Sequence, residues 1–455
     1  MAKEKSVFTC QQCGYESARW YGRCPECGNW NSAVETVISG KRQEIKGKSK
    51  NASKPVLLAS IPVNSTRRVS TKISELDRVL GGGLVPGQVV LIAGEPGIGK
   101  STLLLQVAET LGGKGQDLPA GKAGVKGKSG VLYVSGEESV SQIKIRADRL
   151  GVKSKNIQLL EETDVDSIID VISGLQGASL QGVIIDSIQT MYTSDLTGMS
   201  GSVGQVRECA YRLVRFAKEN NVSIFIVGHV TKQGSVAGPS VLMHIVDTVL
   251  WFEGDKSLTL RLLRAVKNRF GPTDEVGIFS MEDKGLVPLH DPEKLFLSRN
   301  KKITPGSVVT CVLEGTRPIL VEIQSLIVPN KMVYPKRVAQ GLDIRKLELL
   351  IAVLQRRCGL PLYEHDVFVN IASGMSIKND PSADLAICLS IASAYLDKST
   401  RSVMMAIGEV GLLGDIREVY SQEKRVKEAK RLGYSTSITS REVSSLQEAV
   451  RKYLR

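Results

Sequence analysis

One short segment restricts the fold of this chain more than any other part of its sequence. It consists of Gly94, Glu95, Pro96, Gly97, Ile98, Gly99, Lys100 and Ser101, which fit the pattern G-x4-G-K-[ST]. In this pattern, glycines let backbone N–H groups close around phosphates at the start of a helix. The apolar run Val89–Ala93 precedes the segment, and the amphipathic stretch Thr102–Leu111 follows it. Together they predict an α/β nucleotide-binding fold in which the residues from Gly94 to Thr102 bind ATP.

Two of these residues have specific tasks in such a site. Lys100 would contact the β- and γ-phosphates, and the hydroxyl of Ser101 would ligate Mg²⁺ beside a carboxylate from another strand. Asp186 is that carboxylate, because it ends the apolar run Gly182–Ile185 as a Walker B aspartate does. The two motifs, in this order on two strands, predict a Mg-ATP site.

Hydrolysis also needs a group that orients the attacking water. Glu137 and Glu138 directly follow the apolar run Val131–Val134, at the edge where ligands bind in such sheets. The alternative is that the pair forms an ordinary acidic loop. His229 follows the run Ile224–Val227, where it would sense the γ-phosphate or be a passive loop residue.

The surrounding sequence predicts how the domains are arranged. From residue 60 to 290, apolar runs alternate with helical stretches, which is typical of a mainly parallel sheet covered on both faces. Residues 112–130 interrupt this pattern with seven glycines, and we interpret them as a flexible surface insertion. Beyond residue 291 the rhythm changes, and helices at Arg345–Cys358 and Asp384–Leu396 predict a separate α/β domain over residues 291–455.

Four of the eight cysteines fall within the first 27 residues as two Cys-x2-Cys pairs. They are Cys10, Cys13, Cys24 and Cys27. Each pair directs two sulfurs to one point, and four thiolates make a closed, tetrahedral Zn²⁺ site. We therefore predict a zinc ribbon over residues 1–35, which the metal folds because so short a segment lacks a core of its own. A basic linker follows over residues 36–59.

The charge and the apolar runs indicate the kind of partner. Lysine and arginine number 60 against 47 aspartates and glutamates, for a net charge of +13, which favours polyanions and nucleic acid first. No apolar run has the roughly 18 residues that a membrane span needs. The N-terminus has no apolar segment of the secretory type. We expect a cytoplasmic protein with no membrane partner.

The order of the motifs resembles the bacterial RadA (Sms) family, DNA-repair ATPases of the RecA/DnaB-like group. The resemblance rests on the zinc ribbon, GEPGIGKST, YVSGEES, IIDSIQT, GHVTKQG and KNRFG, and it runs over nearly the whole chain. It implies a RecA-like core and a homohexameric, DNA-dependent ATPase that moves on single-stranded DNA. It further implies branch migration of branched recombination intermediates, with the recombinase RecA as a partner. The insertion at 112–130 departs from the family pattern.

The resemblance also implies roles for charged residues outside the phosphate loop. Glu137 would activate the attacking water, ahead of Glu138. Lys267 and Arg269, in the KNRFG segment, would reach the nucleotide of the neighbouring subunit and stabilise the transferred phosphoryl charge. The alternative is that both cations contact DNA phosphates.

Two loops would line the central channel of the ring, by the same resemblance. They are Met191–Gly204 and Thr231–Ser240, the latter with Lys232. Because Tyr192 is their only aromatic residue, we expect salt-sensitive contacts to the DNA backbone rather than base recognition.

The last domain resembles the proteolytic domain of Lon. Asp380–Asp384 parallels the nucleophile motif, with Ser382 at the nucleophile position, and Ile407–Gly414 parallels the strand before the catalytic lysine. A serine nucleophile needs a nearby base. Counting along the chain puts the lysine position at Glu423, with Lys424 next to it, so the dyad is predicted to be broken. We expect a scaffold that organises the ring and offers basic surface to DNA.

Two other functions stay open at this point. A signalling ATPase of the KaiC kind, with protein partners, would also have a RecA-like core and a Glu-Glu pair. An ATP-dependent protease of the Lon kind would need the lysine that the count does not find. The zinc ribbon, the positive charge and KNRFG favour the DNA motor.

Overall fold

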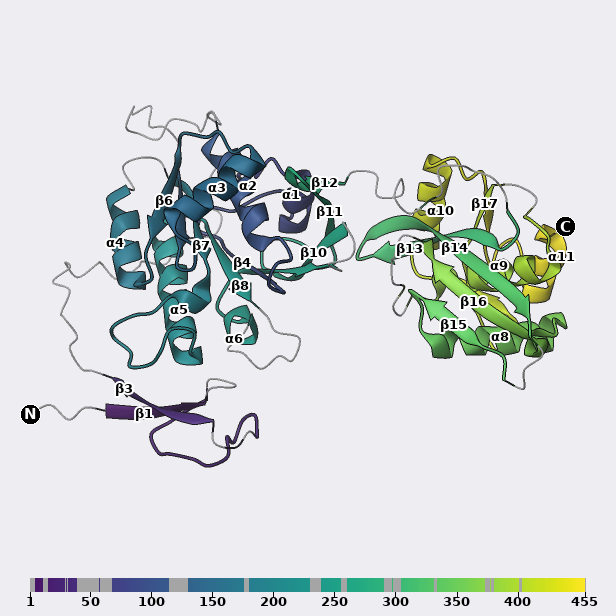
Figure 1. Cartoon of the computed structure of the whole chain (residues 1–455), viewed down its shortest axis with the longest axis horizontal. Coiled ribbons are helices and arrows are strands. Elements are labelled where there is room, and N and C mark those ends of the chain that lie inside the picture. The colour runs from purple at the N-terminus through teal and green to yellow at the C-terminus, as the bar shows by residue number, and fades with distance from the viewer. Residues whose placement is uncertain are drawn as a thin grey trace, which may run out of the picture. The chain divides into compact units, whose positions relative to one another are not determined.

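The computed structural model describes most of the chain, which divides into two compact units at Met1–Leu289 and His290–Arg455 (Figure 1). The described residues are 5–10, 15–28, 30, 32–38, 57, 68–113, 130–175, 180–229, 239–254, 260–289, 297, 304–330, 334–372, 377, 380–400 and 403–454. None of the helices in these ranges is long and apolar enough to cross a membrane. Most of the predicted linker and insertion lies outside the described residues, as does Cys13.

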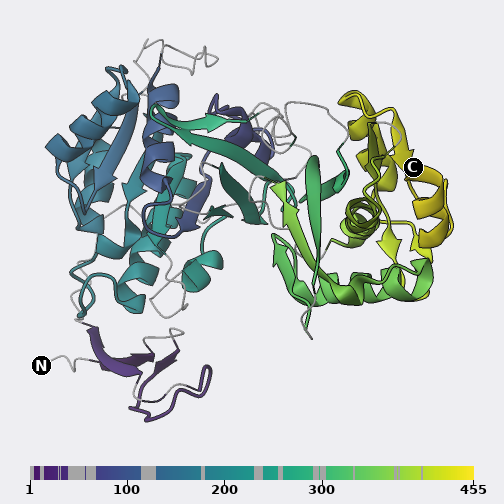
Figure 2. The ribbon, with the colours of Figure 1, turned by 45° about the vertical axis from the view of Figure 1, so that its right-hand side comes forward.

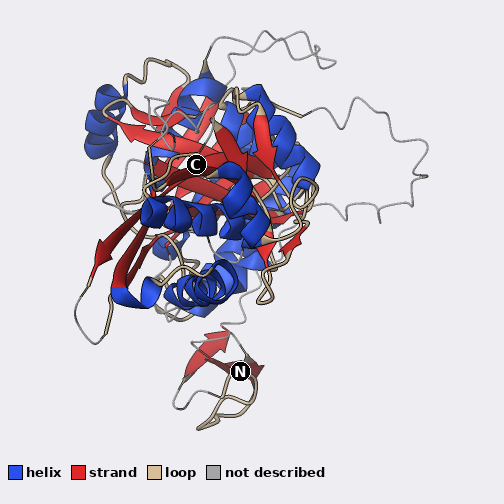
Figure 3. Cartoon of the chain, turned by 90° about the vertical axis from the view of Figure 1, so that its right-hand side faces the viewer, coloured by secondary structure: helices blue, strands red, loops and turns tan. Residues whose placement is uncertain are grey.

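The amino-terminal ribbon is a small antiparallel sheet. Its strands are β1 (Lys5–Cys10), β2 (Glu16–Ser17) and β3 (Ala33–Ile38), in the order β2-β1-β3. Figure 3 shows strands and loops here, without a helix. Among its described side chains, only those of Cys10, Cys24 and Ser32 are buried. The described part of the ribbon therefore has no apolar core, and β3 runs three residues past the predicted end at residue 35.

A nine-stranded sheet forms the centre of the ATPase part of the first unit, in the order β12-β11-β10-β9-β4-β8-β7-β5-β6. Six strands are parallel: β4 (Val89–Gly94), β5 (Gly130–Ser135), β6 (Ile157–Glu161), β7 (Leu180–Asp186), β8 (Ile224–His229) and β9 (Thr248–Glu253). Three antiparallel strands extend it: β10 (Leu260–Asn268), β11 (Val276–Glu282) and β12 (Gly285–Pro288). This mainly parallel sheet confirms the predicted fold class.

Helices cover the sheet on both faces, and alternate strand residues supply two cores (Figure 2). Val90 and Ile92 of β4 belong to one core, whereas Val89 and Leu91 belong to the other. Helices α1 (Ser74–Leu80), α2 (Lys100–Gly112) and α3 (Val140–Leu150) pack in the first core. Helices α4 (Val165–Leu175), α5 (Val203–Asn220) and α6 (Pro239–Met243) pack in the second. Burial on both faces explains why the central strands are apolar throughout.

The second unit has a mixed sheet in the order β15-β16-β14-β13-β17-β20 and a separate β18-β19 hairpin. Its strands are β13 (Ser307–Glu314), β14 (Arg317–Pro329), β15 (Arg337–Gln340), β16 (His365–Ile371), β17 (Met404–Ala406), β18 (Glu409–Val410), β19 (Ile416–Arg417) and β20 (Thr436–Ile438). Its helices are α8 (Ile344–Cys358), α9 (Asp384–Leu396), α10 (Gln422–Arg431) and α11 (Leu446–Tyr453). Helix α9 is buried over its first ten residues and packs on β13 and β14. It forms the centre of this unit.

Candidate nucleotide and metal sites

The predicted nucleotide residues gather at the carboxyl ends of four adjacent strands, β4, β8, β7 and β5. Gly94, at the end of β4, pairs with His229 at the end of β8. Asp186, at the end of β7, pairs with Ser135 at the end of β5, two residues before Glu137. The carboxyl edge of a parallel sheet is where such folds bind ligands. Residues from four separate motifs thus meet at one edge.

The phosphate loop has the backbone shape that its glycines permit. Gly97 and Gly99 have φ of 77° and 116°, values that residues with a side chain rarely adopt. A Cβ on Gly94 would lie 2.6 Å from the carbonyl oxygen of Phe252, so only glycine fits there. Helix α2 begins at Lys100 directly after Gly99. A loop of this shape at a helix N-terminus fits a bound phosphate.

Lys100 is held over this loop by neutral acceptors. Its Nζ donates hydrogen bonds of 2.9 Å to the carbonyl oxygens of Gly94 and Glu95. Burial lowers the pKa of Lys100 to about 8, although the charges of Asp186 and Glu137 act in the opposite direction. The ammonium is therefore short of negative partners, and a polyphosphate would supply them. The Ser101 hydroxyl and the Asp186 carboxylate, at the same edge, are oxygen ligands of the kind that Mg²⁺ prefers.

The structure separates the two glutamates that the sequence places side by side. Glu137 Oε1 accepts a 2.6 Å hydrogen bond from the Ser187 hydroxyl and lies 3.6 Å from His229 Nε2. Glu138 Oε1 instead accepts a 2.8 Å hydrogen bond from Arg146 of α3. Of the two glutamate side chains, only that of Glu137 therefore contacts Ser187 and His229 at the nucleotide edge.

His229 is half-buried beside Glu137, and its buried Nδ1 has no partner among the described residues. Burial, and then the charge of Lys100, hold the pKa of His229 below its ordinary value. The ring is therefore neutral near pH 7 and offers one N–H donor. A neutral donor at this edge suits contact with a phosphate oxygen without adding charge.

The KNRFG residues lie at the opposite edge of the same sheet. Asn268 pairs with Thr248, which begins β9, and Lys267 Nζ donates to the carbonyl oxygens of Met243 (2.6 Å) and Val246 (2.8 Å). Arg269 lies 3.4 Å from the buried carboxylate of Asp247. Strand β4, with six residues, separates this edge from the phosphate loop by about 20 Å. Neither cation therefore lies near the phosphate loop of its own chain.

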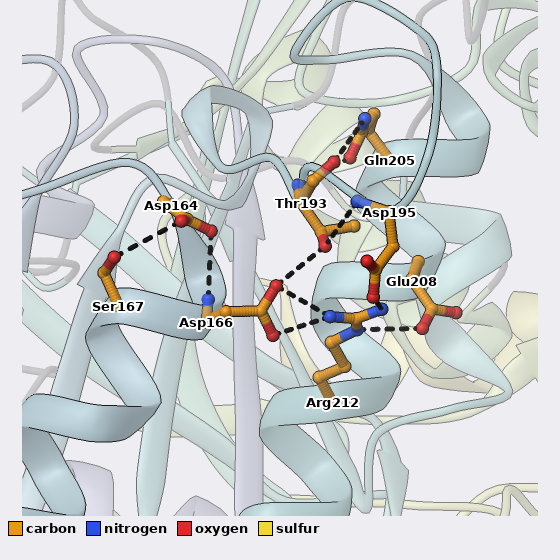
Figure 4. A network of polar contacts seen from close by, with 8 residues as sticks. All are labelled: Asp164, Asp166, Ser167, Thr193, Asp195, Gln205, Glu208 and Arg212. Carbon is orange, nitrogen blue, oxygen red and sulfur yellow. Dashed lines mark hydrogen bonds and ion pairs between the residues drawn. The ribbon is translucent and has the colours of Figure 1, made fainter. Parts of the chain in front are cut away.

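A polar network fixes the base of the Met191–Gly204 loop, which we predicted to contact DNA (Figure 4). Arg212 of α5 binds three carboxylates: both oxygens of Asp166 (2.6 and 2.7 Å), Asp195 (2.7 Å) and Glu208 (2.9 Å). One guanidinium thus ties α4, the loop and α5 together. Because its charge is fully matched by these carboxylates, Arg212 is not a free phosphate-binding cation.

Gln205 closes the same loop through its amide. Its Oε1 accepts the N–H of Thr193 at 2.8 Å, and its Nε2 donates to the carbonyl oxygens of Thr193 (3.1 Å) and Leu196 (2.9 Å). Met199, at the tip, is 87% exposed. The loop contains no lysine or arginine, so any DNA contact here would use N–H groups and hydroxyls. The second predicted loop, around Lys232, lies outside the described residues.

The described ribbon cysteines form a compact thiol cluster. The sulfurs of Cys10, Cys24 and Cys27 lie within 4.8 Å of one another, and those of Cys10 and Cys27 are 3.7 Å apart. Tetrahedral zinc with bonds of about 2.3 Å requires sulfurs about 3.8 Å apart. The cluster therefore fits zinc, with Cys13 as the predicted fourth ligand.

Ser382 in the second unit faces an arginine, which corrects the position that we counted for the lysine. Arg425 donates a 2.6 Å hydrogen bond to Ser382 Oγ, and it also pairs with Asp380 at 2.9 Å. Glu423 is 81% exposed and pairs with Arg441, while Lys424 binds the carbonyl oxygen of Thr316. A guanidinium stays protonated in proteins and cannot take the proton of a serine hydroxyl.

Asp380 completes this buried group. Burial raises its pKa, but the hydrogen bond and charge of Arg425 outweigh that effect and hold the pKa of Asp380 below its ordinary value. The Ser382 hydroxyl itself donates to the carbonyl oxygen of Cys311 at 3.3 Å. Ser382, Asp380 and Arg425 thus all have hydrogen-bond partners within the second unit.

Known proteins are similar to three regions of this chain and to nearly its whole length. Three family models match the chain: a rubredoxin metal binding domain (residues 8–35), an AAA domain (56–235) and subunit ChlI of Mg-chelatase (346–442). The DNA repair protein RadA of Bacillus subtilis is 48% identical over 96% of this chain and 93% of its own length. That of Listeria monocytogenes is 47% identical over 95% and 91%. This chain belongs to the RadA family.

A solved KaiC-like protein of Pyrococcus horikoshii covers 49% of this RadA-family chain and 99% of its own, with 18% identity and a TM-score of 0.40. The AAA match and the phosphate loop make the chain a P-loop ATPase. Sequence reasoning missed Tyr133, Arg146, Ser187 and Arg425 at the two sites. Tyr133 of the YVSGEES motif lies within the run Val131–Val134, which was considered only as apolar core. Ser187 of the IIDSIQT motif directly follows Asp186, and only Asp186 was considered there, as the Walker B carboxylate.

Proposed function

We propose that the chain is a DNA-dependent ATPase that forms a homohexameric ring on single-stranded DNA. It promotes branch migration and the processing of recombination intermediates in DNA repair, in the cytoplasm, with the recombinase RecA as a partner. The observation that carries the proposal is the meeting of Lys100, Asp186 and Glu137 at one sheet edge, in a chain 48% identical to a DNA repair protein RadA. The net charge of +13 supports a nucleic-acid partner.

At the nucleotide site, Lys100 and the loop N–H groups bind the phosphates, and Ser101 and Asp186 hold Mg²⁺, which offsets the charge of the phosphates when it is bound. Glu137 orients the attacking water. The 2.6 Å hydrogen bond from Ser187 fixes the direction of its carboxylate, and neutral His229 donates to the γ-phosphate. Glu138 is turned away to Arg146, so it does not act on the water.

Lys267 and Arg269 act on the nucleotide of the neighbouring subunit. Their place at the sheet edge opposite the phosphate loop supports action in trans. Chains with Lys267→Ala should bind ATP but lose DNA-stimulated hydrolysis, and mixing them with Lys100→Ala chains should restore part of it. If both cations only hold DNA, basal hydrolysis should stay intact, and mixing should restore nothing.

The other parts support the motor. We propose a zinc ribbon over residues 1–35, a basic linker over 36–59, the ATPase domain over 60–290 and a scaffold without protease activity over 291–455. Chelation should release one zinc per chain and unfold the ribbon, because its described residues have no apolar core. Native protein without zinc by elemental analysis would contradict the ribbon assignment.

The deciding experiment is to measure the ATPase rate of the full chain with and without single-stranded DNA. We expect stimulation that falls as salt rises, since backbone contacts release counterions. Double-stranded DNA of the same length is the control. A rate that DNA does not change would overturn the motor and favour a signalling ATPase with protein partners.

A further inference from the structure

Tyr133 is a buried residue of β5 that touches the Walker B carboxylate. Its side chain has no solvent exposure, and its hydroxyl donates a 2.5 Å hydrogen bond to Asp186 Oδ2. The other oxygen, Oδ1, takes no hydrogen bond from any of the described residues. A carboxylate with one oxygen fixed by the protein has a defined direction for the other one. Tyr133 therefore determines how Asp186 faces the nucleotide edge.

Arg146 fixes Tyr133 in turn. One of its terminal nitrogens donates to the Tyr133 hydroxyl at 3.3 Å, and the other donates to Glu138 at 2.8 Å. Glu138 directly precedes Ser139, which caps α3 through a reciprocal capping box with Gln142, and Arg146 lies in the second turn of this helix. The capping box thus fixes the start of α3, and with it the position of Glu138 relative to Arg146.

We propose that Glu138, Arg146 and Tyr133 form a positioning chain that holds the Asp186 carboxylate with Oδ1 presented to the magnesium ion of the nucleotide. The proposal rests on the nucleotide site proposed above. It gives the two adjacent glutamates different tasks: Glu137 acts on the attacking water, and Glu138 acts through two side chains on the metal ligand. None of the three touches the nucleotide, so they are positioning residues.

The positioning chain predicts that removing the Tyr133 hydroxyl weakens only the nucleotide binding that depends on the metal. Without the tyrosine hydroxyl, Asp186 Oδ2 loses its donor inside the protein, and the carboxylate is free to turn. Nucleotide binding that does not use the metal relies on Lys100 and the loop N–H groups, which the tyrosine does not contact. A loss of fold, in contrast, would weaken binding with and without metal alike.

The experiment measures the affinity of the full chain for a fluorescent ADP analogue, once with Mg²⁺ and once with EDTA. For Tyr133→Phe we expect roughly tenfold weaker binding with Mg²⁺ and unchanged binding in EDTA. Excess Mg²⁺ should restore its ATPase rate toward that of the wild type. Tyr211→Phe is the matched control, because it removes an exposed hydroxyl from α5. Equal affinities with Mg²⁺, or equal losses in both conditions, would overturn the positioning chain.

A double-mutant cycle tests the link to Glu138. Arg146→Ala should weaken Mg²⁺-dependent binding several-fold. The double variant Tyr133→Phe/Arg146→Ala should bind the ADP analogue only slightly less tightly than whichever single variant binds it less tightly. Arg146→Lys should recover part of the loss. Glu138→Gln should lower Mg²⁺-dependent affinity slightly, whereas Glu137→Gln should keep affinity and lose hydrolysis. If the losses in binding free energy of the two single variants were additive in the double variant, the positioning chain would be contradicted. Wild-type protein that binds no nucleotide at all would instead refute the nucleotide site itself.

Discussion

The nucleotide edge and the Ser382 site each hold a buried cation, Lys100 and Arg425, and they differ in what that cation is bound to. Lys100, next to Ser101, donates to two neutral carbonyl oxygens, and burial lowers its pKa to about 8. Arg425, next to Ser382, is bound to a carboxylate, a carbonyl oxygen and the hydroxyl itself. The first cation is hydrogen-bonded to no carboxylate among the described residues, and the second is bound to Asp380.

On this difference we propose that the first site binds a ligand and that the second has a structural role. A neutral acceptor is exchanged readily for a phosphate, since the new partner adds charge that the protein did not supply. A buried ion pair with all its hydrogen bonds made gains nothing from a ligand. Similarity in residue type is therefore a weaker guide to activity than the charge balance around the cation.

The largest effect should come from removing the unpaired cation. Lys100→Ala should lower ATP turnover by at least about 10²-fold, because the β- and γ-phosphates lose their phosphate-loop cation. Steady-state phosphate release measures it, and the unfolding temperature should change little. Near-normal turnover would remove the basis for assigning this edge to ATP.

Breaking the paired cation should affect stability instead. Arg425→Ala leaves Asp380 buried without its partner and should destabilise the second unit by about 3–5 kcal/mol. Chemical denaturation of the full chain, followed by a probe in that unit, measures the change. Arg441→Ala is the control, since its pairs with Glu418 and Glu423 are exposed to solvent and should contribute little to stability. Similar losses for both variants would contradict the buried-pair interpretation.

The smallest effect should come from the serine of the second site. Ser382→Ala removes one acceptor from Arg425, but Asp380 and the Cys311 carbonyl oxygen remain, so we expect a loss of about 1 kcal/mol. ATPase rates should not change. Casein should stay uncut by the wild type with ATP and DNA present. Proteolysis that disappears in Ser382→Ala would make the second site catalytic and reverse the comparison.

Much of the central fold could be predicted because its strands are buried on both faces. The run Val89–Ala93 falls within β4, and Val183–Ile185 falls within β7, which extends further at both ends. Strands β6 and β10 were not predicted. Strand β6 has no buried residue, and β10 alternates half-buried and buried residues over its first six positions and carries Arg261 and Arg264. Neither strand is therefore a continuous, buried apolar run.

The phosphate loop could be predicted because its geometry is local, whereas the surroundings of Ser382 could not. Which residue of α10 faces the serine depends on where the helix begins and how it turns, not on a count from the preceding strand. The buried positions of α10 follow helical spacing and are Gln422, Arg425 and Ala429. The exposed positions include Glu423 and Lys424. The contact between Glu138 and Arg146 of α3 could not be predicted either, because it also depends on how a helix is turned.

The phosphate loop and the KNRFG segment lie at opposite edges of one sheet, which gives each copy of the chain a front and a back. An interface that joins Lys267 of one copy to the phosphate loop of the next uses two different surfaces, so it is heterologous rather than two-fold symmetric. Such contacts repeat in the same direction from one copy to the next. They close into a ring when the rotation per copy divides a full turn, and otherwise they wind into an open filament. In the ring proposed above, every nucleotide would have the same orientation along the axis, so successive hydrolysis events would push a threaded strand in one direction.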